Sequence, residues 1–220
     1  MKKLLLSNII GIFFQYFSFL LPIKKWVATR FFIVFKHPKS FWSFHLLALP
    51  RQKILTLSEL DLTTGEGKYL LMGMLEAFQS IIKEHYLSNY RIQVNGGAYQ
   101  KFPLLHFHLG SGVSKSGEDI AYQWALWDGT GARKELGRAR AYIHPEPVRK
   151  HHYLITTDGD VPSFGLLDFG DSTQTGGLLD CFRLAQEMIA AEDFSAYALI
   201  TDVHEGRPDS QLCFHLLGKK

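Results

Sequence analysis

The chain has 220 residues, a net charge of +3 and 46% hydrophobic residues, so it can bury a substantial core as one large domain or two small ones. It has no basic run and no basic–aromatic stripe, which argues against a nucleic-acid partner. The two cysteines, Cys181 and Cys213, form neither a disulfide framework nor a zinc-binding spacing, and this usage fits the cytoplasm.

Residues 4–23 carry no charge and are flanked by lysines at both ends. A segment of this length can span a bilayer, and the absence of a small-residue cleavage site disfavours a signal peptide. Polar residues such as Asn8 and Gln15 lower its hydrophobicity, and the lysines give no orientation. Two expectations stay open for the N-terminal segment 1–25: membrane contact through residues 4–23, or a helix that covers apolar surface on this protein or a partner.

The first half of the remaining chain alternates strand and helix patterns. Strands are predicted from β-branched and aromatic runs, and the helix from apolar residues at helical spacing. His37-Pro38 and Pro50 break the chain, and Gly96-Gly97 is predicted to form a turn. The expected elements are strands at 27–35, 44–49, 90–95 and 104–109, a turn-like piece at 57–61 and a helix over 67–86.

The last of these strands carries two histidines separated by one aromatic residue. Side chains alternate along a strand, so His106 and His108 share one face, while Leu105, Phe107 and Leu109 point into the core. Glycines follow at positions 110 and 112, where the backbone is expected to turn or to approach a ligand closely. The pattern predicts a strand that lines a ligand site.

The same pattern returns at the end of the chain. His215 matches His108 at 215 − 108 = 107 residues, and His144-Pro145 matches His37-Pro38 at the same offset. This constant register predicts a tandem duplication, with units at 26–115 and 141–220 joined by a connecting β-hairpin over 116–140. The further expected elements are strands at 122–127, 138–143, 152–157, 197–201 and 212–217, a hairpin turn at 128–129 and a helix over 177–191.

The order of these pieces resembles the histidine triad superfamily of nucleotide hydrolases and transferases. The resemblance is carried by the strand with His45, by Asn95 and Gln100, and by His106-Phe107-His108, over residues 31–112 and again, more weakly, over 138–219. It implies an α+β fold of two such repeats, each an antiparallel sheet with one main helix, packed as an intramolecular pseudo-dimer. The family pattern has three alternating histidines, and Leu104 takes the first place, so the triad is incomplete.

The resemblance also implies a chemistry. His106 is the nucleophile that attacks an α-phosphate and forms a nucleotidyl-histidine, because neutral imidazole is nucleophilic near pH 7. His108 contacts the phosphate or assists the leaving group. The implied ligand is a nucleotide or nucleotide conjugate, with no cofactor and no metal. The implied substrate-binding residues are His37, His45, Asn95, Gln100 and Ser111.

Several positions depart from the family pattern. His37 stands where the family has an acid or amide that binds ribose hydroxyls, and Lys53 stands where it often has another histidine. In the second unit Cys213 replaces the nucleophile, Gln211 the first histidine and Asp202 the asparagine. We therefore interpret the second unit as a degenerate, mainly structural copy.

Other interpretations stay open beside the enzyme. His106 and His108, joined by His37 and His45, could ligate a metal, although no carboxylate completes the set. The two strand histidines could equally be satisfied polar residues of a half-buried strand. The whole chain could be a catalytically degenerate nucleotide-binding protein or a membrane-tethered scaffold. The sequence carries no signal for its oligomeric state.

Overall fold

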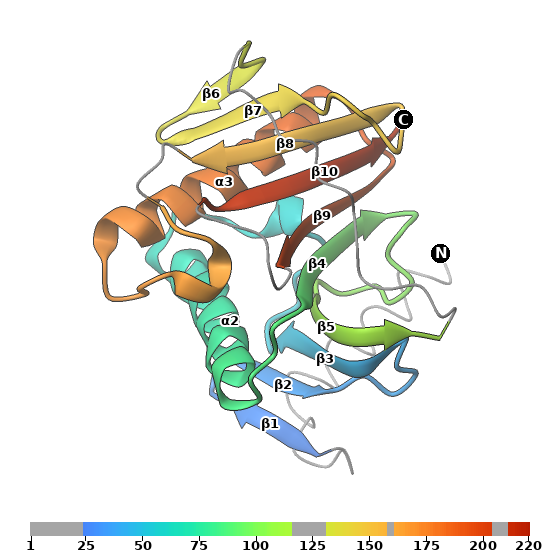
Figure 1. Cartoon of the computed structure of the whole chain (residues 1–220), viewed down its shortest axis with the longest axis vertical. Coiled ribbons are helices and arrows are strands. Elements are labelled where there is room, and N and C mark those ends of the chain that lie inside the picture. Colours follow the sequence, from blue (N-terminus) through green and yellow to red (C-terminus); the bar gives the residue numbers. More distant parts are fainter. Residues whose placement is uncertain (1–23, 116–130, 158–160, 204–210) are drawn as a thin grey trace.

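The structure is a computed structural model that describes residues 24–115, 131–157, 161–203 and 211–220. In this part of the chain one antiparallel ten-stranded sheet curves around two long helices, which pack against the same face (Figure 1). The other face of the sheet carries no helix in the described residues. The expected segments 4–23, 122–127 and 128–129 lie outside the described residues, and among the described residues no helix is long and apolar enough to cross a membrane.

The two halves of the chain contribute five strands each, in mirrored order. The sheet runs β1-β2-β3-β5-β4-β9-β10-β8-β7-β6, and β4 meets β9 at its centre. The first half comprises β1 (Lys25–Ala28), β2 (Phe32–Lys36), β3 (Trp42–Pro50), the 3-10 turn η2 (Leu57–Glu59), α2 (Gly65–Glu84), β4 (Tyr90–Gly97) and β5 (Phe107–Ser114). The second half comprises β6 (Lys134–Leu136), β7 (Ala139–Ile143), β8 (His151–Thr157), the 3-10 turn η3 (Phe164–Leu166), α3 (Ser172–Ala191), β9 (Ala196–Val203) and β10 (Cys213–Lys219).

Both predicted helices and most predicted strands are confirmed, and three details are wrong. The strand expected over 27–35 is a hairpin of β1 and β2, because the Thr29 amide and hydroxyl bond the Phe32 carbonyl and turn the chain. Gly96 and Gly97 continue β4, since they pair with β9 instead of turning. The last strand of the first half starts at Phe107, so residues 104–106 precede it and the glycines at 110 and 112 lie inside it.

The core lies between the sheet and the helices. The prediction that Leu105, Phe107 and Leu109 point into the core is confirmed, because all three are fully buried there. Leu105 precedes β5, and the other two lie in it. Phe182 of α3 contacts both Phe107 and Phe214, which joins the two halves in one core. Each large apolar side chain buried in this way contributes roughly 1.5–3 kcal/mol to folding.

Each helix also holds the 3-10 turn of the opposite half. Gln79 of α2 donates to the carbonyls of Phe164 and Leu167, at 2.9 and 2.8 Å. Gln186 of α3 donates to the carbonyls at 57 and 60, at 2.7 and 2.8 Å. The two glutamines match in the repeat register (186 − 79 = 107), and we call these contacts the reciprocal amide clamps.

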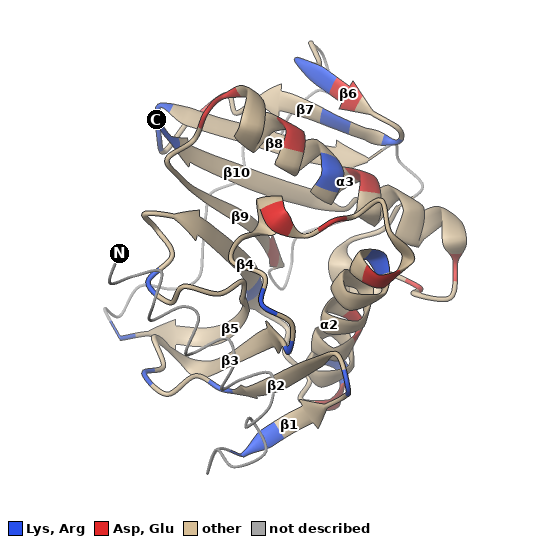
Figure 2. Ribbon diagram, turned by 180° about the vertical axis from the view of Figure 1, so that it is seen from behind, with Lys and Arg blue, Asp and Glu red and all other residues tan. Residues whose placement is uncertain are grey.

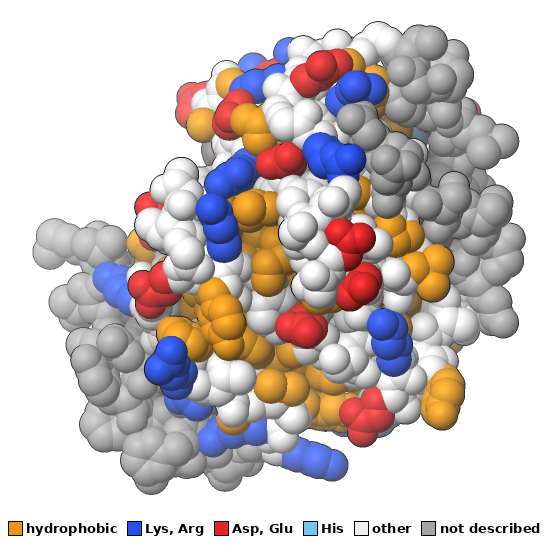
Figure 3. Space-filling view, turned by 90° about the vertical axis from the view of Figure 1, so that its left-hand side faces the viewer, with side chains coloured by type: hydrophobic (Ala, Val, Ile, Leu, Met, Phe, Trp, Pro, Cys, Tyr) orange, Lys and Arg blue, Asp and Glu red, His pale blue; other side chains and the backbone are white. Residues whose placement is uncertain are grey.

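Charged residues of both signs are interspersed over the helix-bearing side of the molecule (Figure 2), so the described residues present no continuous basic surface there. Seen from the side, hydrophobic side chains reach the surface between charged ones (Figure 3).

Candidate active site

A cavity of about 810 Å³ lies on the helix-free face of the first half. It spans β2, β3, β5 and β4, whose alternate residues, such as Val34 and Leu46, face the core on the other side of the sheet. Its lining combines an apolar part with histidines, amides and cationic side chains. The lining residues are Phe35, His37, Pro38, Lys39, Phe41, Trp42, His45, Leu47, Leu49, Arg91, Gln93, Asn95, Tyr99, Lys101, Phe102, His106 and His108.

His106 is held in one tautomer by the backbone. Its Nδ1 lies 2.7 Å from the carbonyl oxygen of Leu104, and because a carbonyl only accepts, Nδ1 carries the proton and donates it. Burial lowers the pKa of His106, which keeps the ring neutral near pH 7. Its Nε2 therefore carries the lone pair. The residue that replaces the first histidine of the family pattern thus orients the second one through its main chain.

His45 and His108 form a directed pair. The amide of Phe41 donates to His45 Nδ1 at 3.0 Å, so the proton of that neutral ring sits on Nε2. His45 Nε2 lies 3.0 Å from His108 Nδ1 and donates to it, which leaves the proton of His108 on Nε2. Burial lowers the pKa of His45 to about 3 and that of His108 well below its usual value. Beside the lone pair of His106, the site thus places an N–H donor on His108.

His37 joins this group from the end of β2. Its ring stacks on His45 with centroids 4.2 Å apart and an interplanar angle of 11°. The amide of Lys39 donates to His37 Nδ1 at 3.0 Å, so Nε2 carries the proton. Burial lowers the pKa of His37 as well, which makes it a neutral hydrogen-bond donor.

The spacing of these three rings raises the question of a metal. His37, His45 and His108 each have a ring nitrogen within 4.8 Å of the others. A metal needs a lone pair from each ring, however, and the hydrogen bonds already occupy all three Nδ1 atoms and place the protons on Nε2. The hydrogen bonding of the cluster therefore does not fit a metal ion.

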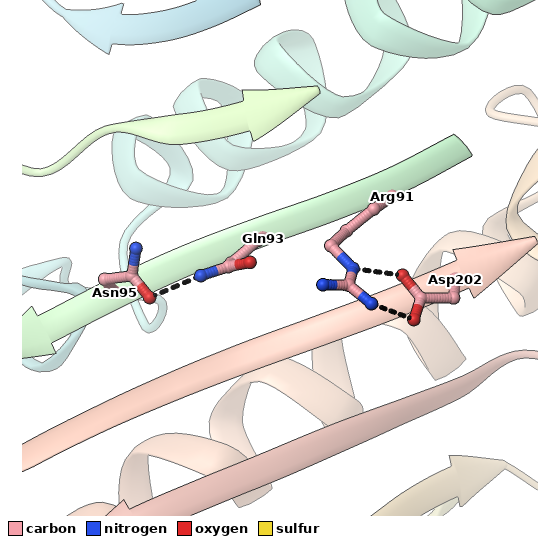
Figure 4. Close-up of polar contacts among 4 residues, drawn as sticks. All are labelled: Arg91, Gln93, Asn95 and Asp202. Atoms are coloured by element: carbon pink, nitrogen blue, oxygen red, sulfur yellow. Dashed lines mark hydrogen bonds and ion pairs between the residues drawn. The ribbon is translucent and has the colours of Figure 1, made fainter. Parts of the chain in front are cut away.

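Two amides and an ion pair form a polar row along β4 and β9 (Figure 4). Gln93 Nε2 donates to Asn95 Oδ1 at 2.7 Å, which leaves the Asn95 side-chain N–H groups as donors at the cavity. Arg91 binds Asp202 with two hydrogen bonds of 2.6 and 2.7 Å. The Asp202 side chain is completely buried, so this ion pair is largely shielded from solvent. Asp202 occupies the register position of Asn95 (202 − 107 = 95), and its carboxylate is engaged by Arg91.

Comparison with known proteins places the chain among relatives. Residues 23–120 match the family model described as "Scavenger mRNA decapping enzyme C-term binding". This match covers just under half of the chain and supports the resemblance to the histidine triad superfamily. No curated protein matches it.

Solved structures extend this likeness across both halves. The chain resembles a galt-like protein from Arabidopsis thaliana with a TM-score of 0.66 and 11% identity, over 94% of this chain and 81% of that one. An ADP-glucose phosphorylase from the same plant, with bound ADP-glucose, gives 0.66 and 11% over 94% and 80%. A HIT family hydrolase from Clostridium thermocellum covers 50% of this chain and 96% of its own, with a TM-score of 0.42 and 22% identity. The first two likenesses show that the fold includes both halves of the chain.

Five of the seven predicted site residues line one cavity, and Gln100 and Ser111 do not. Gln100 Nε2 donates to the carbonyls of Leu55, Phe102 and Leu104, at 2.7, 2.8 and 2.7 Å. It holds the loop whose Leu104 carbonyl orients His106. Ser111 donates its hydroxyl to the Asn89 carbonyl at 2.6 Å, so it stabilises the sheet.

Sequence reasoning missed Lys39, Gln93, Lys101 and Phe102, which also line the cavity. Gln93 was accessible, because the alternation of β4 places it on the same face as Asn95. The other three lie in connecting segments, where no periodicity indicates the direction of a side chain.

The second half of the chain repeats the histidine arrangement in its described residues. His152 Nε2 lies 2.7 Å from His215 Nδ1, and His144 stacks on His152 with centroids 4.0 Å apart. Burial lowers the pKa of His152 to about 4. Cys213 stands at the register position of His106 (213 − 107 = 106), and it borders a cavity of about 40 Å³. The described residues of this half keep the directed histidine pair but have a cysteine in place of the ring that corresponds to His106.

Proposed function

We propose that the protein is a nucleotide phosphohydrolase or nucleotidyltransferase that acts at an α-phosphate through a nucleotidyl-histidine on His106. The observation that carries this proposal is the hydrogen bond from His106 Nδ1 to the Leu104 carbonyl, because it leaves the Nε2 lone pair for attack in a cavity large enough for a nucleotide. The family-model match over residues 23–120 and the structural likeness to a protein with bound ADP-glucose support a nucleotide-type ligand.

The residues suggest a two-step reaction. In the first step the Nε2 lone pair of His106 forms a bond to the α-phosphorus, and the bond from phosphorus to the leaving oxygen breaks, with its electron pair departing on that oxygen. The Nδ1 proton stays on the ring, and the positive charge of the modified ring is stabilised by the Leu104 carbonyl. His108 Nε2–H and the Asn95 amide donate to the phosphoryl oxygens, where charge accumulates in the transition state.

In the second step an acceptor attacks the phosphorus from the opposite side. The phosphorus–nitrogen bond breaks, and its electron pair returns to His106 Nε2. Water as acceptor gives hydrolysis and releases a proton to solvent, whereas a phosphate or hydroxyl acceptor gives transfer. His45 does not exchange a proton in this scheme, because its Nδ1 is held by the Phe41 amide. It fixes the tautomer of His108 instead.

Incubation with a nucleotide conjugate labelled at the α-phosphorus tests the proposal, with a quench in base so that a phosphorus–nitrogen bond survives. We expect label on the parent protein and none on His106→Ala. The matched control is Cys213→Ala, which changes the same register position in the other half and should keep the label. Label on His106→Ala would contradict the assignment. Nucleotide binding without label or product would instead favour a catalytically degenerate binding protein.

We further propose that the chain is a fused duplication, with units at 26–115 and 141–220 and a connection at 116–140. The mirrored strand order and the reciprocal amide clamps support this arrangement, because corresponding elements make the same contacts with the opposite half. The catalytic unit is the first one, and the second provides the other half of the sheet and core. In this proposal a unit expressed alone should not give a cooperative unfolding transition. Cooperative unfolding of an isolated unit as a monomer would contradict it.

A further inference from the structure

The polar lining of the cavity has one sign of charge. Among the described residues that line it there is no Asp or Glu, whereas Lys39 and Lys101 add two positive charges and Arg91 a third. The charge of Arg91 is balanced by Asp202, so the two lysines dominate. One phosphoryl group at His106 and His108 does not account for both of them. The lining therefore suits a ligand with a second anionic group.

In the turn after β2, the side chains of His37 and Lys39 offer only hydrogen-bond donors to the cavity. His37 Nδ1 is taken by the Lys39 amide, and Ser40 closes the turn by donating to the His37 carbonyl at 3.0 Å. What His37 brings to the cavity is its Nε2–H, and what Lys39 brings is an ammonium group. Neither group has a free acceptor for a hydrogen bond from a sugar hydroxyl, whereas both can donate hydrogen bonds to a phosphate, whose oxygens accept them.

The position of this turn relates it to one part of a nucleotide. An apolar patch of Phe35, Leu47, Leu49 and Phe102 forms one side of the cavity and suits a base. Phe102 lies against His106, with ring centroids 5.9 Å apart, and His37 lies 5.9 Å from His108 by the same measure. A ligand with its base on the patch and its α-phosphorus at His106 has its sugar between them. Because His37 follows Phe35 by two residues and also borders the histidine group, the sugar lies beside His37.

We infer that the preferred substrates carry a phosphate on the ribose, at the 2′ or 3′ hydroxyl, in addition to the attacked 5′ phosphate, and that His37 and Lys39 bind it. This inference rests on the proposed function of the same site. His37 is the residue that determines specificity. An acid or amide at that position would accept hydrogen bonds from free hydroxyls, whereas a neutral imidazole with its acceptor atom occupied favours a phosphate.

Titration calorimetry on the full chain tests the inference with 5′-monophosphates, 2′,5′-bisphosphates and 3′,5′-bisphosphates of adenosine and guanosine. We expect one bisphosphate to bind at least about tenfold more tightly than the corresponding monophosphate, since charge-assisted hydrogen bonds to one more phosphate are worth at least this factor. The two bisphosphates separate the 2′ from the 3′ position. His37→Asp should reverse the preference, because a carboxylate repels the added phosphate, and His37→Gln should weaken it if the aspartate variant does not fold.

The matched pair Lys39→Gln and Lys36→Gln separates a specific contact from general electrostatics. Lys36 is an exposed neighbour that does not line the cavity, so its variant should keep the preference, whereas Lys39→Gln should lose most of it. Equal affinity of mono- and bisphosphates would refute this inference while leaving the proposed function intact. Failure of every nucleotide to bind would refute both.

Discussion

Mild acid should destabilise this protein strongly, because the fold buries histidines that have to stay neutral. Burial is the largest cause of the lowered pKa of His45, which falls to about 3, and of His152, which falls to about 4. In the unfolded chain both rings titrate near 6.5. At a pH between the folded and unfolded pKa values, the unfolded state binds more protons than the folded state. The free energy of unfolding therefore decreases as the pH falls below about 6.5, and it is fully retained above that pH.

The pKa values set the size of the effect. A single group with a pKa of about 3 when folded and 6.5 when unfolded lowers the free energy of unfolding by about 2 kcal/mol between pH 7 and pH 5. His152 acts in the same direction. For His152 we take half of that figure, about 1 kcal/mol, to allow for screening by solvent. Together they remove about 3 kcal/mol, a large fraction of the roughly 5–15 kcal/mol that stabilises a typical domain.

Urea unfolding at pH 7, 6 and 5, followed by tryptophan fluorescence, measures this loss directly. In His45→Gln the titrating ring is gone, while the amide still offers a donor to His108. Its free energy of unfolding should depend less steeply on pH than that of the parent, by about 2 kcal/mol over this range. His152→Gln should show a smaller reduction of the same sign. A parent stability that is flat from pH 7 to pH 5, or equal slopes for parent and His45→Gln, would refute the reasoning.

Two further changes test the junction between the halves by urea unfolding at pH 7. In Gly96→Ala the new Cβ would lie 2.0 Å from the Tyr197 ring, so we expect the free energy of unfolding to fall by about 1–3 kcal/mol or more. The control is Gly65→Ala at the start of α2, where the new Cβ meets nothing within 4 Å and should cost nothing. Equal effects of the two changes would count against the packing argument. Asp202→Asn removes one charge of the buried pair with Arg91 and should cost about 3–5 kcal/mol, whereas replacing both residues with apolar ones should recover most of it. A double variant as unstable as the single one would show that the loss does not come from an unpaired charge.

The pattern of apolar residues predicted the main elements because it reflects burial. The helix over 67–86 appears within two residues of its expected bounds, and the alternation around Phe107 placed both strand histidines on one face. The break at Thr29 was not predicted, because a threonine in a β-branched run is typical of a strand. Only the contacts of Thr29 with Phe32 show the turn. Gly96 was taken for a turn residue, although its lack of a side chain makes room for the Tyr197 ring.

Residue types indicated the candidate chemistry but not the protonation states of the site residues. His106 can be proposed as a nucleophile from its place in a motif, whereas the tautomer depends on the Leu104 carbonyl that happens to face it. Gln100 illustrates the converse, since an amide in the expected position bonds three main-chain carbonyls and does not line the cavity. Hydrogen bonds to the main chain depend on loop geometry, and no spacing in the sequence encodes that.

The reciprocal amide clamps make each half of the chain depend on the other. The carbonyls of Leu57 and Leu60 in the first half accept hydrogen bonds from Gln186 of α3, the helix of the second half. Without α3 these two carbonyls would lose their hydrogen bonds, and the 3-10 turn between β3 and α2 would be held less firmly. The second half is therefore needed for the structure of the first half. Its own histidine site can change, but side chains that bind the first half, such as Gln186, have to be retained.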